Sequence, residues 1–171
     1  MIFTSWYPSP VGNLFLAAGE DALVGLWLAG EKYFPDHLQN TAQRRDDHPV
    51  LLQAKGWLDR YFAGQRPDPA ELKLAPEGSR FRHQVWELLL HIPYGQVTTY
   101  GALAKELALR QGIPSMSAQA VGGAVGHNPI SIIIPCHRVV GADGSLTGYA
   151  GGLDKKTQLL ELEGALFPRS G

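Results

Sequence analysis

Cysteine is almost absent from this chain of 171 residues, which contains one, Cys136. A single cysteine has no partner for a disulfide within the chain, and it excludes a zinc site built from several thiolates. Two readings of Cys136 remain. It is either a small buried apolar side chain, as free cysteines usually are, or a nucleophile. Its neighbours in the sequence bear on that choice.

Long hydrophobic runs are also absent. No apolar stretch reaches the roughly 20 residues that a membrane-spanning helix needs. The start, Met1-Ile2-Phe3-Thr4, lacks the basic residues of a signal peptide. We therefore expect a cytoplasmic protein with no membrane contact, and a reducing compartment suits a free thiol.

The chain has no large excess of charge of either sign. Its net charge is -1, with 7 basic and 10 acidic side chains in residues 1–78 and 8 basic and 6 acidic side chains in residues 79–171. A strongly basic nucleic-acid-binding protein would carry more positive charge than this. Taken alone, the charge balance disfavours DNA as a partner.

Cys136 follows a proline that interrupts an apolar β-type run, Ile132 to Val140. Proline cannot continue a central strand, so Cys136 is expected at a strand end or in a turn. There, His137 and Arg138 can supply positive charge that favours a thiolate. Neighbouring side chains on a strand point to opposite faces, so Cys136 and His137 can cooperate only if the backbone turns or a water bridges them.

The N-terminal part, residues 1–78, reads as an α/β domain. Apolar positions at helical spacing predict an amphipathic helix from His48 to Ala63, which would cover one face of a small antiparallel sheet. His37 and His48 are isolated and show no zinc spacing, so we expect no metal, and no cofactor is indicated. The predicted strands are 2–7, 13–18 and 22–29, with a short edge strand at 72–74.

The C-terminal part, residues 79–171, reads as a mainly α domain that begins after the linker Pro76-Glu77-Gly78. Three helices are predicted, and the second and third are joined by a tight connection, which is the layout of a helix-turn-helix in a winged-helix-like fold. The predicted helices are 80–91 after Ser79, a second from Thr98 or Thr99 through Ala108, and a third from Ser115 or Ser117 to about Val125.

The third helix is almost bare of side chains. It contains several alanines and glycines, although each interior glycine costs about 1 kcal/mol of helix propensity relative to alanine. Something is therefore expected to approach its backbone closely. A neighbouring helix is one candidate, and the narrow minor groove of DNA, which admits only a slim element, is the other.

The segment around Cys136 resembles a known family. Pro135-Cys136-His137-Arg138, with Asn128-Pro129 before it, Gly148 to Gly152 after it and Glu163 downstream, is similar to the O6-alkylguanine-DNA alkyltransferases, also called methylated-DNA-protein-cysteine methyltransferases. The resemblance covers about Phe81 to Gly164. It implies DNA repair by irreversible transfer of an alkyl group from O6-alkylguanine to Cys136, once per molecule, with O4-alkylthymine as a second candidate substrate.

The resemblance also implies how the protein meets its substrate. Its partner would be double-stranded DNA, bound in the minor groove, with the alkylated nucleotide flipped out of the stack into a pocket. The protein would act as a monomer.

The resemblance assigns a role to each catalytic residue. Cys136 would be the nucleophile and alkyl acceptor, His137 would take its proton through a water, and Glu163 would orient His137. Asn128 would tie its turn to the reactive segment, and Tyr100 would protonate or hydrogen-bond the departing base. Each residue has an ordinary alternative, since Glu163 could be a solvated charge, Tyr100 a core side chain and Asn128 part of a simple turn.

Other residues would hold the flipped base. The backbone carbonyls of Cys136 and Val139 would read the guanine edge. Tyr149 and the Ala150 amide would contact O6, and Lys156 would support their loop.

The DNA-contacting set depends on the bare helix. Family members often carry an arginine, which enters the duplex in place of the flipped base, where this chain has the uncharged Gln119. No Lys or Arg occurs between Gln111 and His137, so we expect weak binding with a shallow salt dependence. The residues assigned to DNA contacts are Ser115, Ser117, Gln119, Gly122 and Arg138.

Three other functions remain open. An alkyltransferase-like protein would bind alkylated DNA without transfer, but such relatives carry another residue in place of the cysteine. A thiol hydrolase with a Cys-His-Glu triad would turn over repeatedly and would not need DNA. A helix-turn-helix regulator is disfavoured because the bare third helix has almost no side chains to read bases.

Overall fold

The computed structural model describes residues 1–165, which form two compact units. Unit 1 comprises Met1–Glu77 and the short segment Pro129–Ser131. Unit 2 comprises Gly78–Asn128 and the chain from Ile132 onward. The sequence predicts a division at residue 78. The contacts group Gly78 with unit 2 and, in addition, group the segment 129–131 with unit 1.

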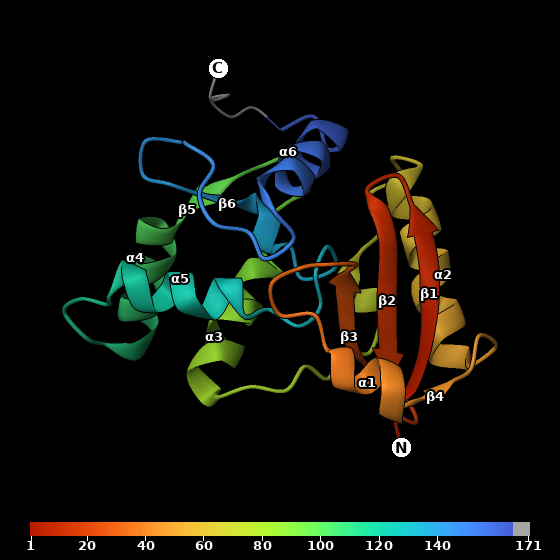
Figure 1. The fold of residues 1–171 in the computed structure, drawn as a ribbon. Helices are drawn as coiled ribbons and strands as arrows, with labels where there is room; N and C mark the ends of the chain where they lie inside the picture. Colours follow the sequence, from red (N-terminus) through yellow and green to blue (C-terminus); the bar gives the residue numbers. More distant parts are fainter. Residues whose placement is uncertain (166–171) are drawn as a thin grey trace. The chain divides into compact units, whose positions relative to one another are not determined.

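Unit 1 is built on a four-stranded sheet with the strand order β3-β2-β1-β4 (Figure 1). Strands β1 to β3 form the antiparallel meander that the sequence predicts, because alternating apolar residues are separated by tight turns. The strands are β1 (Phe3–Ser9), β2 (Gly12–Ala18), β3 (Leu23–Leu28) and β4 (Gln43–Arg44).

The sheet is mixed, whereas the sequence predicts an antiparallel one. Strand β4 pairs parallel with β1, and Ile130 forms an isolated parallel bridge with Leu26 of β3. The sequence predicts neither pairing, because both involve very short segments reached by long connections. Helix α1 (Asp36–Thr41) lies in the connection that leads to β4. The predicted edge strand at 72–74 forms one parallel bridge, between Leu74 and Leu23.

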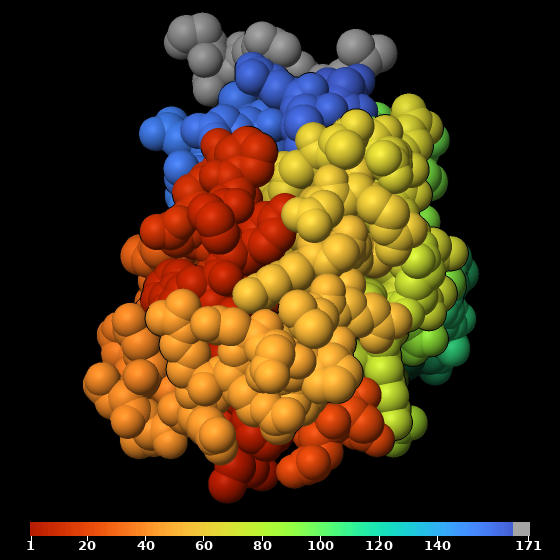
Figure 2. Space-filling view, turned by 90° about the vertical axis from the view of Figure 1, so that its right-hand side faces the viewer, coloured from red at the N-terminus to blue at the C-terminus, as the bar shows by residue number. Residues whose placement is uncertain are grey.

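Helix α2 (Pro49–Phe62) packs on the sheet and is the amphipathic helix predicted from the apolar spacing. His48 caps it, since its Nδ1 accepts a hydrogen bond from the amide of Val50 at 3.3 Å, and Pro49 occupies the first helical position. Figures 1 and 2 both show α2 beside β1. The helix buries Leu51, Ala54, Trp57, Leu58 and Tyr61.

The other face of the sheet also has apolar cover. Phe15 and Trp27 form a buried cluster there, and the ring of Phe34 lies 5.5 Å from that of Phe15. Leu38 of α1 packs against the same cluster. Unit 1 therefore has hydrophobic layers on both sides of β2.

Unit 2 contains the predicted helix-turn-helix. Thr99 caps the second helix and Ser117 caps the third, each by accepting a hydrogen bond from a backbone amide in the first turn. The indole Nε1 of Trp86 donates to the carbonyl of Ala124 at 2.8 Å and so fixes the third helix against the first. The helices are α3 (Arg80–Leu89), α4 (Tyr100–Gln111), α5 (Ala118–Gly126) and α6 (Leu153–Leu162).

A two-stranded parallel sheet joins two distant parts of unit 2. Strand β5 (Thr98–Thr99) precedes α4, and β6 (Val139–Val140) follows the segment that contains Cys136. Each strand has two residues, which is too short for a sequence pattern to reveal. Within residues 1–165 no helix is both long enough and apolar enough to cross a membrane.

Candidate active site around Cys136

The segment that carries Cys136 turns sharply. Residues Cys136–Arg138 form one turn of 3₁₀ helix, closed by a hydrogen bond from the Arg138 amide to the Pro135 carbonyl at 3.0 Å. The backbone therefore bends between Cys136 and His137, which is one of the two conditions for their cooperation. Cys136 is 6% exposed, so the residue is buried rather than in open solvent.

His137 and Glu163 form a buried pair. Nε2 of His137 lies 2.7 Å from Oε2 of Glu163, and both side chains are fully buried. Burial lowers the pKa of His137, although the hydrogen bond and the charge of Glu163 act in the opposite direction. At neutral pH the imidazole is thus neutral and able to accept a proton.

Glu163 is held as a carboxylate. Burial alone would raise its pKa, but the hydrogen bonds and charges of His137 and Arg138 outweigh that effect and hold the pKa well below its usual range. A carboxylate only accepts hydrogen bonds, so His137 must carry its proton on Nε2. Its Nδ1, which has no hydrogen-bond partner among the described residues, is then the basic nitrogen.

Arg138 belongs to the same buried network. Its Nε and Nη2 donate to Oε1 and Oε2 of Glu163 at 2.8 and 3.0 Å, and its Nη1 donates to the carbonyl of Ile92 at 2.7 Å. The residue is 7% exposed. These contacts correct the sequence-based assignment of Arg138 to DNA. A buried guanidinium with all three nitrogens engaged does not fit a surface contact with phosphate.

Asn128 is hydrogen-bonded to the segment that leads to Cys136. Its Nδ2 donates to the carbonyl of Ile134 at 2.8 Å, which joins the turn at Asn128-Pro129 to the residue two positions before Cys136. Between them Ile132 has a φ of 72°, a left-handed conformation that is costly for a β-branched residue. The connection is thus held in a strained conformation directly upstream of Cys136.

Comparison with known proteins gives a consistent answer. Residues 80–165 match the model of the 6-O-methylguanine DNA methyltransferase DNA-binding domain, and residues 2–76 match that of the ribonuclease-like domain of the same enzymes. The chain belongs to the 6-O-methylguanine DNA methyltransferase family. The sequence-based identification is therefore confirmed, and it extends to the N-terminal part.

Individual members of this methyltransferase family resemble the chain over almost its whole length. A methylated-DNA-protein-cysteine methyltransferase of Haemophilus influenzae is 41% identical over 95% of this chain and 86% of the relative. One of Methanosarcina acetivorans is 43% identical over 93% and 96%. A crystal structure of a Mycobacterium tuberculosis O6-methylguanine methyltransferase has a TM-score of 0.81 at 40% identity, covering 96% of this chain and 93% of the other.

A further solved structure contains nucleic acid. It is described as Mycobacterium tuberculosis OGT in complex with DNA, and it matches with a TM-score of 0.78 at 38% identity, covering 95% of this chain and 92% of that one. The methyltransferase fold observed here is thus shared with a protein crystallised on DNA.

Tyr100, predicted from the methyltransferase resemblance to assist the departing base, lies at the start of α4. Its hydroxyl donates to the carbonyl of Thr147 at 3.2 Å. Burial raises the pKa of Tyr100, and the charge of Cys136 acts in the same direction, whereas the bond to Thr147 opposes them. Tyr100 therefore stays protonated and lies within electrostatic range of Cys136.

Lys156 is the most deeply buried cation of the predicted set. Its side chain is 0% exposed, and its Nζ donates to the carbonyls of Val139, Thr147 and Gly148 at 2.6, 2.8 and 3.4 Å. Burial lowers its pKa to about 8, while the charge of Cys136 acts to raise it. Lys156 thus joins β6 to the loop before Tyr149, in line with the expected support of that loop.

The other residues predicted to contact the base are Val139, Tyr149 and Ala150. The Val139 carbonyl, expected to read the guanine edge, accepts a hydrogen bond from Lys156. Tyr149 and Ala150 are half-buried in the loop that leads to α6, and the hydroxyl oxygen of Tyr149 is buried.

Helix α5 presents an open, bare surface. A Cβ added at Gly123 would meet nothing within 4 Å among the described residues, and one at Gly122 would make ordinary contact with the Tyr100 ring. Packing against a neighbouring helix therefore does not explain Gly123, whereas Gly122 faces the Tyr100 ring of α4. Ser115 and Gln119 are exposed beside them, and Ser117, also exposed, has its hydroxyl engaged in capping α5.

Several participants in the site could not be named from sequence. They are mainly backbone groups, such as the Ile92 carbonyl that receives Arg138 and the Gly95 amide that donates to Oε1 of Glu163 at 3.2 Å. Backbone groups have no residue-type signature. The one local signal was the Tyr94-Gly95 turn, which the sequence predicts only as a helix end.

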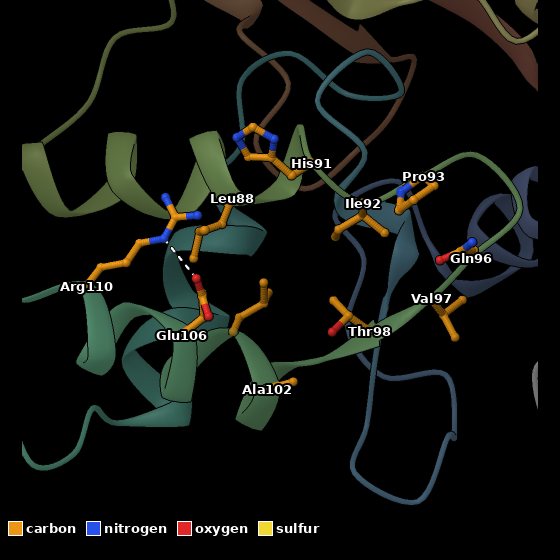
Figure 3. A pocket seen from close by; sticks show the side chains of 11 residues that line it. Leu88, His91, Ile92, Pro93, Gln96, Val97, Thr98, Ala102, Glu106 and Arg110 are labelled. Carbon is orange, nitrogen blue, oxygen red and sulfur yellow. Dashed lines mark hydrogen bonds and ion pairs between the residues drawn. The ribbon is translucent and has the colours of Figure 1, made fainter.

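A cavity of about 370 Å³ is lined in part by the connection between α3 and β5 (Figure 3). Its walls come from the end of α3, residues 92–98 and α4, and none of the predicted site residues lines it. In the part of the chain that the structure describes, no group of three or more His, Cys, Asp or Glu side chains could hold a metal ion.

Proposed function

We propose that this protein repairs DNA by transferring the alkyl group of O6-alkylguanine directly and irreversibly to Cys136, once per molecule. The observation that carries the proposal is the position of the sole cysteine, on a tight turn next to the buried His137–Glu163 pair. Close relatives named as methylated-DNA-protein-cysteine methyltransferases support the same activity.

The transfer needs a thiolate and a stabilised leaving group. Neutral His137 takes the thiol proton on Nδ1 through a bridging water, and Glu163 stabilises the imidazolium that forms. The sulfur then attacks the alkyl carbon, forming the S–C bond as the C–O6 bond breaks. The electron pair of the C–O6 bond stays on the purine. Tyr100 protonates or hydrogen-bonds this departing base.

The product is a thioether on Cys136. None of the residues in this site supplies a step that cleaves it, so each molecule reacts once. The same scheme applies to O4-alkylthymine, which presents an alkyl carbon in a similar ether linkage.

The DNA would be bound through α5. The helix is slim enough for the minor groove, and its open glycine face would lie against the sugar-phosphate walls. Ser115, Ser117 and the helix N-terminus would contact phosphates, and Gln119 would occupy the space of the flipped nucleotide. The protein would act as a monomer in the cytoplasm, where its thiol stays reduced.

The flipped base would enter beside the reactive turn. The carbonyls of Cys136 and Val139 would accept hydrogen bonds from the guanine edge. Tyr149 and the Ala150 amide would contact O6. Lys156 would hold the two sides of this pocket together through its three carbonyl bonds.

A mass measurement tests the proposal. Incubation with duplex DNA carrying O6-methylguanine should add one methyl group to the peptide containing Cys136, in an amount that never exceeds one per protein molecule. Cys136→Ala should show no gain in mass while retaining DNA binding. Repeated turnover would indicate a hydrolase, and methyl on another residue would contradict the assignment of Cys136.

A further inference from the structure

We propose that Arg138 is a positioning residue for the proton relay: it keeps Glu163 as a pure acceptor, and thereby fixes the proton of His137 on Nε2 and leaves Nδ1 available to the thiol. The inference deepens the function proposed above, but its principal test does not require DNA. Arg138 touches neither the reacting sulfur nor, in the proposed pose, the base.

The contacts of Glu163 carry the inference. Its carboxylate accepts hydrogen bonds from Arg138 Nε and the Gly95 amide on Oε1, and from Arg138 Nη2 and His137 Nε2 on Oε2. A planar guanidinium that meets both oxygens is the donor best matched to a carboxylate. Arg138 therefore supplies the charge that allows Glu163 to stay ionised in a buried place.

Arg138 is itself held in place. Its Nη1 donates to the Ile92 carbonyl at 2.7 Å, and its guanidinium carbon lies 5.7 Å from the centre of the Tyr94 ring. The Tyr94 hydroxyl donates to the carbonyl of Leu162, next to Glu163 in the chain. The connection between α3 and β5 thus supports both members of the Arg138–Glu163 pair.

The charged and titratable groups around His137 come from two elements, its own turn and α6. Cys136 and Arg138 lie on its own turn, Lys156 lies on α6, and Glu163 caps the end of α6. The charges of Arg138 and Lys156 both lower the pKa of His137, whereas Glu163 raises it. Removing Arg138 therefore raises the pKa of His137.

Without Arg138 the buried Glu163–His137 pair would bind an additional proton more tightly, and would release it only at a higher pH than in the wild-type protein. If the proton lies on the imidazole, Nδ1 is no longer basic. If it lies on Glu163, that carboxyl becomes a donor to Nε2, and the histidine proton moves to Nδ1. In either case the relay cannot accept the thiol proton, so the acid limb of the pH–rate profile moves upward.

The test compares Arg138→Gln and Arg138→Lys with wild type. The rate of Cys136 alkylation by iodoacetamide is measured from about pH 5 to pH 9. Arg110→Gln is the matched control, since Arg110 also pairs with a glutamate of the same unit, Glu106, but at an exposed site (Figure 3). Circular dichroism and thermal unfolding report whether each variant is folded.

We expect the acid limb of R138Q to move up by about one pH unit, which lowers the rate on that limb by roughly tenfold and leaves the rate at high pH nearly unchanged. R138K, which keeps the charge, should recover most of that loss, and R110Q should match wild type. An equal loss for R138Q at every pH, an unchanged profile, or a failure of R138K to recover the rate would each overturn the proposal.

A second measurement covers the case in which R138Q does not fold. The ¹⁵N chemical shifts of His137 in the wild-type protein, assigned by comparison with His137→Gln, report its tautomer directly. The Nε2–H form at neutral pH supports the proposal, and the Nδ1–H form overturns it.

The DNA reaction separates this inference from the proposed function. Absence of methyl transfer from O6-methylguanine together with a shifted iodoacetamide profile would reject the function and retain the role of Arg138. Transfer that proceeds in R138Q with the wild-type pH profile would reject the role and retain the function.

Discussion

His137 illustrates how neighbours decide the chemistry of a single residue. Its burial lowers the pKa and keeps the ring neutral, while Glu163 fixes which nitrogen holds the proton. The sequence places a histidine next to the cysteine, but an exposed imidazole there would have neither property. The buried carboxylate, 26 residues further along the chain, makes the difference.

Gln119 leads to a prediction at the same scale. If it fills the gap left by a flipped nucleotide, Gln119→Ala should slow repair of O6-methylguanine in duplex DNA by roughly tenfold, because one inserted hydrogen-bonding side chain contributes about 1–2 kcal/mol. The rate of reaction with the free base O6-methylguanine should change little. Both rates can be measured by methyl incorporation at Cys136.

Gln158→Ala is the control for this substitution, because Gln158 is also an exposed helical glutamine but lies on α6. It should leave both rates unchanged. Equal slowing of the duplex and free-base reactions by Q119A would remove Gln119 from the proposed role.

At the scale of secondary-structure elements, the long ones follow from local pattern and the short ones do not. The sequence predicts helix α2 and the meander because apolar residues recur there at a regular spacing over many positions. The caps at Thr99 and Ser117 mark where α4 and α5 begin. Strands β4, β5 and β6 have two residues each, so they exist only because a distant partner pairs with them.

The connection between α3 and β5 gives a testable case. Gly95 has a φ of 82°, and an added Cβ would lie 3.1 Å from the carbonyl oxygen of Glu163. Gly95→Ala should therefore destabilise the protein by about 1–3 kcal/mol, through backbone strain together with this close contact. It should also slow the alkylation of Cys136, because the Gly95 amide helps to hold Glu163. Denaturant unfolding and the iodoacetamide rate measure the two effects.

Gly112→Ala is the control for the backbone effect, since Gly112 has a φ of 68° but an added Cβ would meet nothing within 4 Å in the described chain. This substitution should lower the free energy of unfolding by about 1 kcal/mol without slowing the alkylation of Cys136. Equal effects of the two substitutions would show that the contact with Glu163 is unimportant.

At the scale of the whole molecule, a buried acid in unit 1 should make stability depend on pH. Glu31 is buried, its Oε2 has no hydrogen-bond partner among the described residues, and burial raises its pKa to about 8, with a backbone bond to Leu28 opposing the shift. The folded protein thus keeps a proton that the unfolded chain releases near pH 4.5. The protonated Glu31 therefore contributes fully to the stability of the fold below pH 4.5, and this contribution is lost as the pH rises toward 8.

Glu31→Gln should remove this dependence. We expect the variant to exceed wild type in unfolding free energy by about 2 kcal/mol at pH 8 and to gain much less at pH 5. Urea unfolding followed by tryptophan fluorescence suits the measurement, because Trp6, Trp27 and Trp57 lie in unit 1. A constant difference between the two proteins at both pH values would refute a protonated Glu31.

The sequence by itself determined the family and the helix-turn-helix, and it predicts the roles of Cys136 and His137, because these depend on residue type and on periods that repeat within one element. Only the tertiary structure decided that Arg138 is buried against Glu163 instead of facing DNA, and that Ile92 and Gly95 complete that network. The reason is physical. Adjacency in the chain fixes which groups are available, whereas burial and the partner of each hydrogen bond depend on segments that meet only after folding.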